Sequence, residues 1–173
     1  MKKNFRFCPF CGGALEKKRE GAFKRLFCAR CKEAFYNNPV PAVAVAVLKE
    51  GRVLMVKRKI NPCRGMWCLP GGFIEGNESI ESAAKRELFE ETGQRARKIT
   101  ILSAKRENTL IFGSIIVIGV SAEGISGRLK AGDDASDAVY FEAGKPPLIP
   151  FASHRLALRE ALKRDRAEKD AAG

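Results

Sequence analysis

The chain has 173 residues, of which 45% are hydrophobic, and it carries a formal net charge of +12 at pH 7. This length and composition suffice for one ordinary domain plus a small module, and they exclude wholesale disorder. No apolar run approaches the roughly 20 residues of a membrane span, and no hydrophobic signal core follows the basic N-terminus, so we expect a cytoplasmic protein without a membrane partner. The positive charge favours anionic partners such as nucleotides or nucleic acid, although an ordinary solvated surface explains it equally well.

Two CxxC pairs near the N-terminus predict a metal site. Cys8 and Cys11 form the first pair, Cys28 and Cys31 the second, and the sixteen residues between the pairs are typical of a four-thiolate zinc site. Two disulfides are disfavoured in the cytoplasm, and a redox motif would precede a βαβ pattern. Four thiolates leave no open position for water, so we expect structural Zn²⁺ that supplies folding free energy to a segment over residues 1–38 that resembles a zinc ribbon.

A second domain is expected over residues 39–165, because prolines punctuate its start. Apolar runs at 42–48 and 53–59, separated by a glycine-containing turn, predict a β-hairpin. Cys63 and Cys68 have no partners at CxxC spacing and are expected to be small buried or partly buried thiols. The remaining predicted elements are strands at 99–106, 110–120 and 138–141, helices at 79–92 and 153–164, and a flexible tail at 166–173.

The helix predicted at 79–92 has recognisable ends. Asn77 suits the N-cap, and Gly93 suits the left-handed position that follows a last helical turn. Between them the apolar residues recur every four positions and form one stripe, which consists of Ile80, Ala84 and Leu88.

Three carboxylates gather near the C-terminal end of this helix. Glu87, Glu90 and Glu91 stand at i, i+3 and i+4, so they crowd one face, repel each other and oppose the helix dipole. A hard divalent cation such as Mg²⁺ or Mn²⁺ prefers oxygen ligands and would compensate this repulsion. The alternative is a solvated acidic face held by salt bridges to Lys85 and Arg86.

Together with the glycines before it, this helix resembles the Nudix box: Gly, five residues, Glu, seven residues, Arg-Glu, an aliphatic residue, one residue, Glu-Glu, one residue, Gly. The matching residues are Gly72, Glu78, Arg86, Glu87, Leu88, Glu90, Glu91 and Gly93. Gln94 stands where the family has an aliphatic packing residue. The resemblance covers roughly residues 39–164 and implies an α/β (α+β) fold, with a mixed β-sheet sandwiched between helices.

The resemblance also implies a catalytic Mg²⁺ or Mn²⁺ site in a hydrolase that cleaves phosphoanhydride bonds. Glu87 and Glu91 are the first expected metal ligands, and Glu90 is the next. The backbone carbonyl of Gly71 or Gly72 is expected to add a further oxygen.

Other box residues are expected to orient the site and to move a proton. Arg86 and Glu78 are expected to form an ion pair that holds the loop against the helix. Family resemblance places the general base either in the box, at Glu87 or Glu90, or on a downstream carboxylate, for which Asp134 is the first choice. A simple polar turn explains the segment around Asp134 equally well.

Three further residues are predicted to contact substrate. Arg58, at the end of the second strand, and Arg64, in the loop before the box, are placed to meet phosphates, although either could equally be a surface ion-pair partner. Phe112 is a stacking partner for a base, with plain core packing as the stronger alternative. For His154, the sole histidine, capping or packing is favoured over catalysis.

A zinc ribbon directly before a Nudix domain resembles bacterial and plant enzymes that hydrolyse NADH, ADP-ribose or FAD. The chain lacks the Ser-Gln-Pro-Trp-Pro-Phe-Pro motif of the NADH group and the downstream proline of many ADP-ribose enzymes, since no proline lies between Gly93 and Lys145. We expect cleavage of the pyrophosphate bond in a nucleoside diphosphate linked to a second group, and a homodimer. The alternative is a nucleic-acid-binding or nucleotide-sensing protein that uses the ribbon, with the Nudix domain acting on capped RNA or as a regulator.

Overall fold

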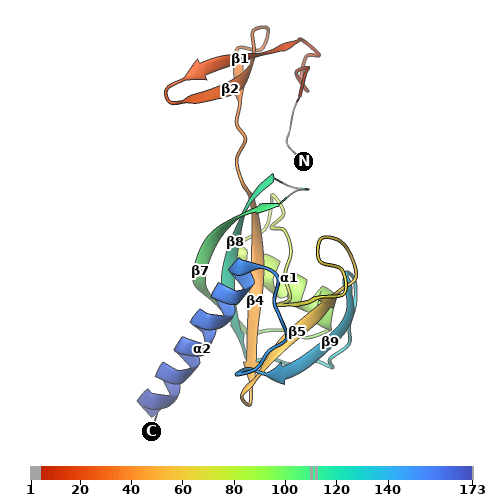
Figure 1. The fold of residues 1–173 in the computed structure, drawn as a ribbon, viewed down its shortest axis with the longest axis vertical. Coiled ribbons are helices and arrows are strands. Elements are labelled where there is room, and N and C mark those ends of the chain that lie inside the picture. The colour runs from red at the N-terminus through yellow and green to blue at the C-terminus, as the bar shows by residue number, and fades with distance from the viewer. Residues whose placement is uncertain (1–4, 110, 112, 173) are drawn as a thin grey trace. The chain divides into compact units, whose positions relative to one another are not determined.

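The computed structural model describes residues 5–109, 111 and 113–172. The chain divides into two compact units, one of Met1–Pro39 with Asn108–Ser114 and one of Val40–Glu107 with Ile115–Gly173 (Figure 1). Within the described residues, no helix is both long and apolar enough to cross a membrane.

The first unit holds a three-stranded antiparallel sheet of β1 (Leu15–Glu20), β2 (Phe23–Cys28) and β3 (Glu33–Phe35). Ahead of β1, the chain turns tightly at the first CxxC pair, where the N–H of Gly12 donates to the carbonyl of Cys8 at 2.9 Å. Gly12 has a φ of 70°, which a residue without a Cβ adopts readily.

The second unit is built on a six-stranded mixed sheet with the order β6-β5-β4-β8-β7, in which β9 also pairs with β5. Strands β4 and β8 run parallel, and β4 and β5 form the predicted hairpin. The six strands are β4 (Val40–Lys49), β5 (Arg52–Arg58), β6 (Trp67–Cys68), β7 (Lys98–Thr109), β8 (Gly113–Glu123) and β9 (Ala135–Glu142).

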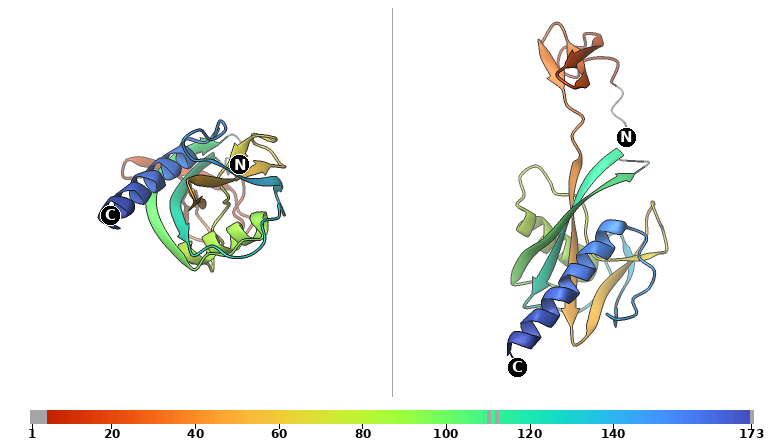
Figure 2. Two further views of the ribbon diagram at one scale, coloured as in Figure 1. Left: turned by 90° about the horizontal axis from the view of Figure 1, so that it is seen from below. Right: turned by 60° about the vertical axis from the view of Figure 1, so that its left-hand side comes forward.

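Two helices cover opposite faces of this sheet (Figure 2), which confirms the predicted sandwich: α1 (Ile80–Thr92) and α2 (Ala152–Ala172). Strand β4 lies between the two cores, and its side chains point alternately into one and the other. Its valines pack toward α1 with Leu88, whereas its alanines pack toward α2 with Leu158. Small residues let α2 lie close to the sheet. At Gly119 of β8, for example, an added Cβ would lie 2.6 Å from the Cβ of Ala157.

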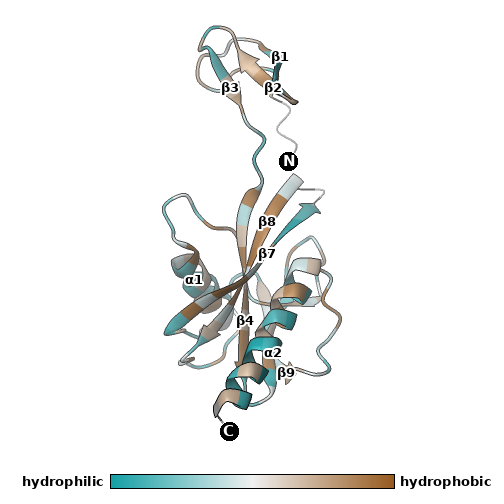
Figure 3. Ribbon diagram, turned by 90° about the vertical axis from the view of Figure 1, so that its left-hand side faces the viewer, coloured by the Kyte–Doolittle hydropathy of each residue, from teal (hydrophilic) through white to brown (hydrophobic). Residues whose placement is uncertain are grey.

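The last helix is longer than the sequence predicts. We expected it to end near Arg164, but α2 continues to Ala172 and alternates hydrophobic and hydrophilic residues along its length (Figure 3). Ion pairs at i, i+4 stabilise the added turns, from Arg164 to Glu168 at 2.6 Å and from Lys169 to Asp165 at 2.6 Å.

Candidate active site

Helix α1 begins at a different cap from the one predicted. The cap is Ser79, whose hydroxyl accepts a hydrogen bond from the N–H of Ser82 at 3.1 Å, while the Ser82 hydroxyl accepts from the N–H of Ser79 at 2.9 Å. Asn77 is therefore wrong as the N-cap. Gly93 takes the predicted left-handed conformation, with a φ of 68°, and its N–H donates to the Phe89 carbonyl.

Arg86 is the centre of the polar network on α1. Its guanidinium forms two parallel bonds to Glu78, Nε to Oε1 at 2.6 Å and Nη2 to Oε2 at 2.8 Å, which is the expected pair. It also donates to Glu87 at 2.7 Å, to Glu90 at 2.9 Å and to the Phe73 carbonyl at 3.0 Å. Hydrogen bonding to Arg86 lowers the pKa of Glu78 to about 2. Arg86 thereby ties the loop before α1 to two of the three clustered carboxylates.

Glu91 is a carboxylate buried against that loop, with only 5% of its surface exposed. Its Oε2 accepts the N–H of Gly71 at 2.9 Å. Burial raises the pKa of Glu91 to about 8, against the lowering effect of that hydrogen bond, and the nearby Glu87 charge raises it further. A buried carboxylate next to other carboxylates ionises readily only beside a cation, which is the chemistry of a metal ligand.

Glu87 lies against the backbone of Gly72. A Cβ built at Gly72 would be 2.4 Å from the Oε1 of Glu87, so any larger residue there would displace the Glu87 carboxylate. Burial raises the pKa of the Glu87 carboxyl, while the ion pair with Arg86 opposes that shift. The box glycine and this box glutamate, fifteen positions apart, thus form one wall of the site.

The two glycine carbonyls face different directions. N–H groups of β4 donate to the carbonyls of Pro70 and Gly72, each at 2.8 Å. Because carbonyls alternate along extended backbone, the Gly71 carbonyl points away from β4, to the side where the Gly71 N–H meets Glu91. A Cβ at Gly71 would lie 2.1 Å from the carbonyl oxygen of Val43, so this approach also requires glycine. The geometry favours the Gly71 carbonyl over that of Gly72 as a metal ligand.

A downstream loop closes over the C-terminal end of α1. The N–H of Gly132 donates to the Glu91 carbonyl at 3.1 Å, and the carbonyl of Asp134 accepts the N–H of Lys59 at 2.8 Å. The charge of Asp134 contributes to raising the pKa of Glu91, and that of Asp133 does the same for Glu87. The loop therefore places both aspartates within electrostatic range of the box. Sequence reasoning singled out only Asp134.

The predicted substrate-contacting residues have different surroundings. The Nε of Arg58 donates to the Pro62 carbonyl at 2.7 Å, its guanidinium lies 5.3 Å from the Phe151 ring centre, and its charge lowers the pKa of Glu91. Arg64 is exposed in the loop before β6. Phe112 lies outside the described residues.

His154 packs in the core, as predicted. Its ring lies 5.1 Å from that of Phe151, and burial lowers its pKa to about 3, so it is neutral at physiological pH. Cys68 is buried and Cys63 is partly buried, and both are free thiols, as predicted.

The four ribbon cysteines converge on one point. Their Sγ atoms all lie within 4.8 Å of one another, with Cys8 to Cys31 at 3.8 Å and Cys11 to Cys28 at 3.5 Å. Zn–S bonds of about 2.3 Å in a tetrahedron put sulfurs about 3.8 Å apart, so the cluster fits zinc. Disulfides are excluded, because an S–S bond is only about 2.05 Å long. Across the described part of the chain, no other group of three or more potential metal ligands comes this close together. Among the glutamates of α1, Glu87 and Glu90 bind the Arg86 guanidinium and Glu91 binds the Gly71 N–H.

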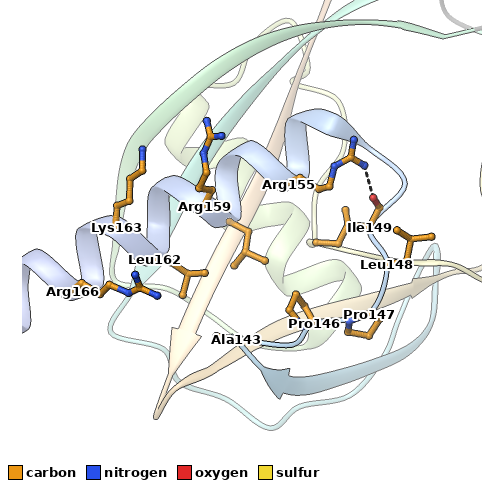
Figure 4. Close-up of a pocket in the computed structure, with 11 residues that line it drawn as sticks. Ala143, Pro146, Pro147, Leu148, Ile149, Arg155, Arg159, Leu162, Lys163 and Arg166 are labelled. Atoms are coloured by element: carbon orange, nitrogen blue, oxygen red, sulfur yellow. Dashed lines mark hydrogen bonds between the residues drawn. The ribbon is translucent and has the colours of Figure 1, made fainter.

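A separate cavity of about 550 Å³ lies between α2 and the segment that precedes it (Figure 4). Leu158 and Leu162 line it from the helix and Pro146 and Leu148 from the segment, and none of the predicted site residues contributes. It opens on the α2 side of the sheet, whereas the glutamates lie on the α1 side, so it is not the catalytic pocket.

Comparison with known proteins identifies the class to which this fold and site belong. The model of the NUDIX domain matches residues 38–159. The chain is 36% identical to an ADP-ribose pyrophosphatase of Methanocaldococcus jannaschii over 136 residues, which cover 76% of this chain and 78% of that protein. The chain belongs to the NUDIX family and is a NUDIX hydrolase.

Two further proteins extend the likeness over the ribbon. The NAD-capped RNA hydrolase NudC of Vibrio parahaemolyticus is 30% identical over 163 residues, which cover 92% of this chain but only 60% of that protein. A NUDIX hydrolase structure from Nitrosomonas europaea superposes with a TM-score of 0.73 at 27% identity, covering 94% of this chain and 93% of that one.

Proposed function

We propose that this protein cleaves the pyrophosphate bond of a nucleoside diphosphate linked to a second group, with ADP-ribose as the first substrate to test. The observation that carries the proposal is the carboxylate cluster of α1, where a buried Glu91 and an Arg86-bound Glu87 face the glycine loop. The M. jannaschii relative, named as an ADP-ribose pyrophosphatase, supports the choice of substrate.

Glu87, Glu91 and the Gly71 carbonyl would hold Mg²⁺ or Mn²⁺, with Glu90 as a further ligand. The ion would neutralise diphosphate charge and acidify a bound water. The residues suit such an ion, because three carboxylates near the C-terminal end of α1 offer hard oxygen donors and burial makes ionisation of Glu91 unfavourable without a cation.

The chain's own residues would do the remaining work. Arg86 fixes Glu87 and Glu90 against the loop, so the ligands need little reorganisation when the ion and substrate bind. Asp134 or Glu90 would take the proton from the attacking water. Arg58, held by the Pro62 carbonyl and the Phe151 ring, would pair with a substrate phosphate, and the exposed Arg64 would do so from the loop.

The ribbon would bind structural Zn²⁺ through Cys8, Cys11, Cys28 and Cys31, as their tetrahedral spacing supports. We further propose that the protein acts in the cytoplasm as a homodimer, a state that analytical ultracentrifugation would test.

The decisive experiment measures phosphate-containing products from ADP-ribose, NADH, NAD⁺, FAD, diadenosine polyphosphates and nucleoside triphosphates with Mg²⁺ or Mn²⁺. We expect ADP-ribose turnover that EDTA abolishes and that Glu91→Gln lowers by at least a hundredfold. Glu81→Gln is the matched control, because Glu81 lies on the same helix but pairs only with Lys85 at the surface. Equal turnover by both variants would contradict the metal assignment.

A further inference from the structure

The ribbon has an unusual surface for so small a module. Its residues 5–39 contain eight lysines and arginines against three glutamates, and half of the aromatic residues of the whole chain. Several of these aromatic rings are exposed rather than packed, including Phe10 at 79% and Tyr36 at 55%. Exposed rings among cations are typical of surfaces that bind unpaired nucleic acid bases and their phosphates.

The register of the three strands separates the charges onto two faces. Lys17 lies opposite Leu26, and Arg19 lies opposite Lys24, so these side chains share one face of the sheet. Leu26 in turn lies opposite Phe35 of β3, which places Phe35 on that same face. We call this surface the basic face.

The opposite face is nearly neutral, because its cations are matched by acids. Lys18 and Arg25 lie there with Glu16 and Glu20, and Arg25 pairs with Glu20 at 3.1 Å. Within the described part of the ribbon, no ion pair joins Lys17, Arg19 or Lys24 to a carboxylate. Their charges are therefore available to a ligand.

Phe35 of the basic face also lines an aromatic concavity. The ring of Phe10 stacks on that of Phe35, with centroids 6.1 Å apart and planes inclined by 22°. Together with Phe5 and Tyr36 these rings line a concavity of about 690 Å³ within the ribbon itself. The outer side of Phe10 is free to stack with a planar ring, since most of its surface is exposed.

We propose that this surface binds a single-stranded segment of nucleic acid, with a base stacked on Phe10 and phosphates held by Lys17, Arg19 and Lys24. Duplex nucleic acid fits less well, because its paired bases have no free stacking face to offer Phe10. A protein partner is less favoured, because Lys17, Arg19 and Lys24 lack paired carboxylates among the residues that the structure describes and suit the regularly spaced phosphates of a nucleic acid. The inference does not depend on which nucleotide the NUDIX domain hydrolyses.

The test measures fluorescence anisotropy of a labelled 12-nucleotide oligouridylate with the full-length, zinc-loaded chain. We expect the triple variant Lys17→Ala, Arg19→Ala, Lys24→Ala to bind at least tenfold more weakly, with the slope of log Kd against log salt reduced by about 2, as expected for three lost phosphate contacts. The matched control removes three exposed cations from α2, Arg159, Lys163 and Arg166, and should weaken binding less than threefold.

Phe10→Ala tests the stacking separately. It should weaken binding of the oligouridylate by between about fivefold and a hundredfold, the range for loss of one stacking ring, and leave binding of a 12-base-pair RNA duplex unchanged. Zinc content by elemental analysis verifies that each variant keeps a folded ribbon.

Two outcomes would overturn the inference. Equal losses in the ribbon and α2 triple variants would show that only overall charge attracts the RNA. A Phe10→Ala protein that changes its sedimentation coefficient but not its RNA affinity would show that the ring contacts a second copy of the chain. Anisotropy measures binding and requires no turnover. Its result can therefore be interpreted even if the proposed hydrolase activity is not found.

Discussion

Arg86 and Glu78 are joined by two parallel hydrogen bonds, Nε to Oε1 at 2.6 Å and Nη2 to Oε2 at 2.8 Å, although one lies on α1 and the other in the turn before it. Only a planar guanidinium makes this contact while also reaching Glu87 and Glu90. The pair therefore sets where the carboxylates of the site lie before any ion or substrate binds.

Replacing Arg86 with Lys should reduce metal affinity and kcat/KM about 10- to 100-fold, because a single ammonium cannot hold the loop and two glutamates together. Titration with Mn²⁺, followed by its paramagnetic effect on water relaxation, measures the affinity directly. Lys85→Arg is the control, since Lys85 forms only an exposed pair with Glu81. If Arg86→Lys keeps full Mn²⁺ affinity, the positioning role is wrong.

Gly72→Ala should lower kcat/KM about 100-fold, because its methyl group would displace the Glu87 carboxylate that lies 2.4 Å from the Cβ position. Gly76→Ala is a matched control in the same loop, where a Cβ meets nothing within 4 Å. Steady-state kinetics of the two variants at saturating Mg²⁺ give the comparison. Similar kcat/KM values for the two variants would show that activity does not depend on the position of the Glu87 carboxylate.

His154 should make the folded state sensitive to acid. Burial depresses its folded pKa to about 3, so the unfolded chain, with an ordinary pKa near 6.5, binds the proton first as pH falls. The His154 contribution is fully present above about pH 6.5 and is lost progressively down to about pH 3, by about 2 kcal/mol at pH 5.

Urea unfolding of the wild type and of His154→Leu at pH 7.5 and pH 5 would check this expectation. The difference between the two proteins isolates His154 from other titrating groups. The variant should lose about 2 kcal/mol less than the wild type between these pH values. Parallel losses would show that His154 is protonated in the folded state.

Cys11→Ser should abolish stoichiometric zinc and unfold the ribbon, because structural zinc supplies most of the folding free energy of so small a module. The second unit has its own core and should keep its thermal transition. Elemental analysis and calorimetry give the two readouts, with Cys63→Ser, which lies outside the cluster, as the control. One zinc per chain in the Cys11 variant would refute the four-thiolate site.

Sequence spacing predicted the local parts of this molecule well. Two CxxC pairs predicted the cysteine cluster, and the apolar runs of β4 and β5 predicted their hairpin, because both patterns express a local geometric requirement. Resemblance to the box predicted the pairing of Arg86 with Glu78, and the glycine after the last helical turn predicted the left-handed Gly93.

Two kinds of feature escaped prediction: the local cap of α1 and the contacts between elements that are distant in sequence. Ser79 replaces Asn77 as the cap because Ser82 completes a reciprocal pair of hydrogen bonds with it, where the usual pattern has Glu or Gln in the place of Ser82. The approach of the Gly132 loop to Glu91 and the direction of the Gly71 carbonyl arise from packing against other elements. No periodicity in the sequence encodes either of them.

The alanines of β4 and the missing side chain at Gly119 have an effect at a distance. They let α2 settle close to the sheet, and at the start of that helix Phe151 lies against both the His154 ring and the Arg58 guanidinium. A larger residue such as Val in place of Ala44 or Ala46 would push α2 away from the sheet. This would move the Phe151 ring away from Arg58. Substitutions beneath α2 would thus lower the rate of turnover by displacing Arg58, although they touch neither the glutamates nor the substrate.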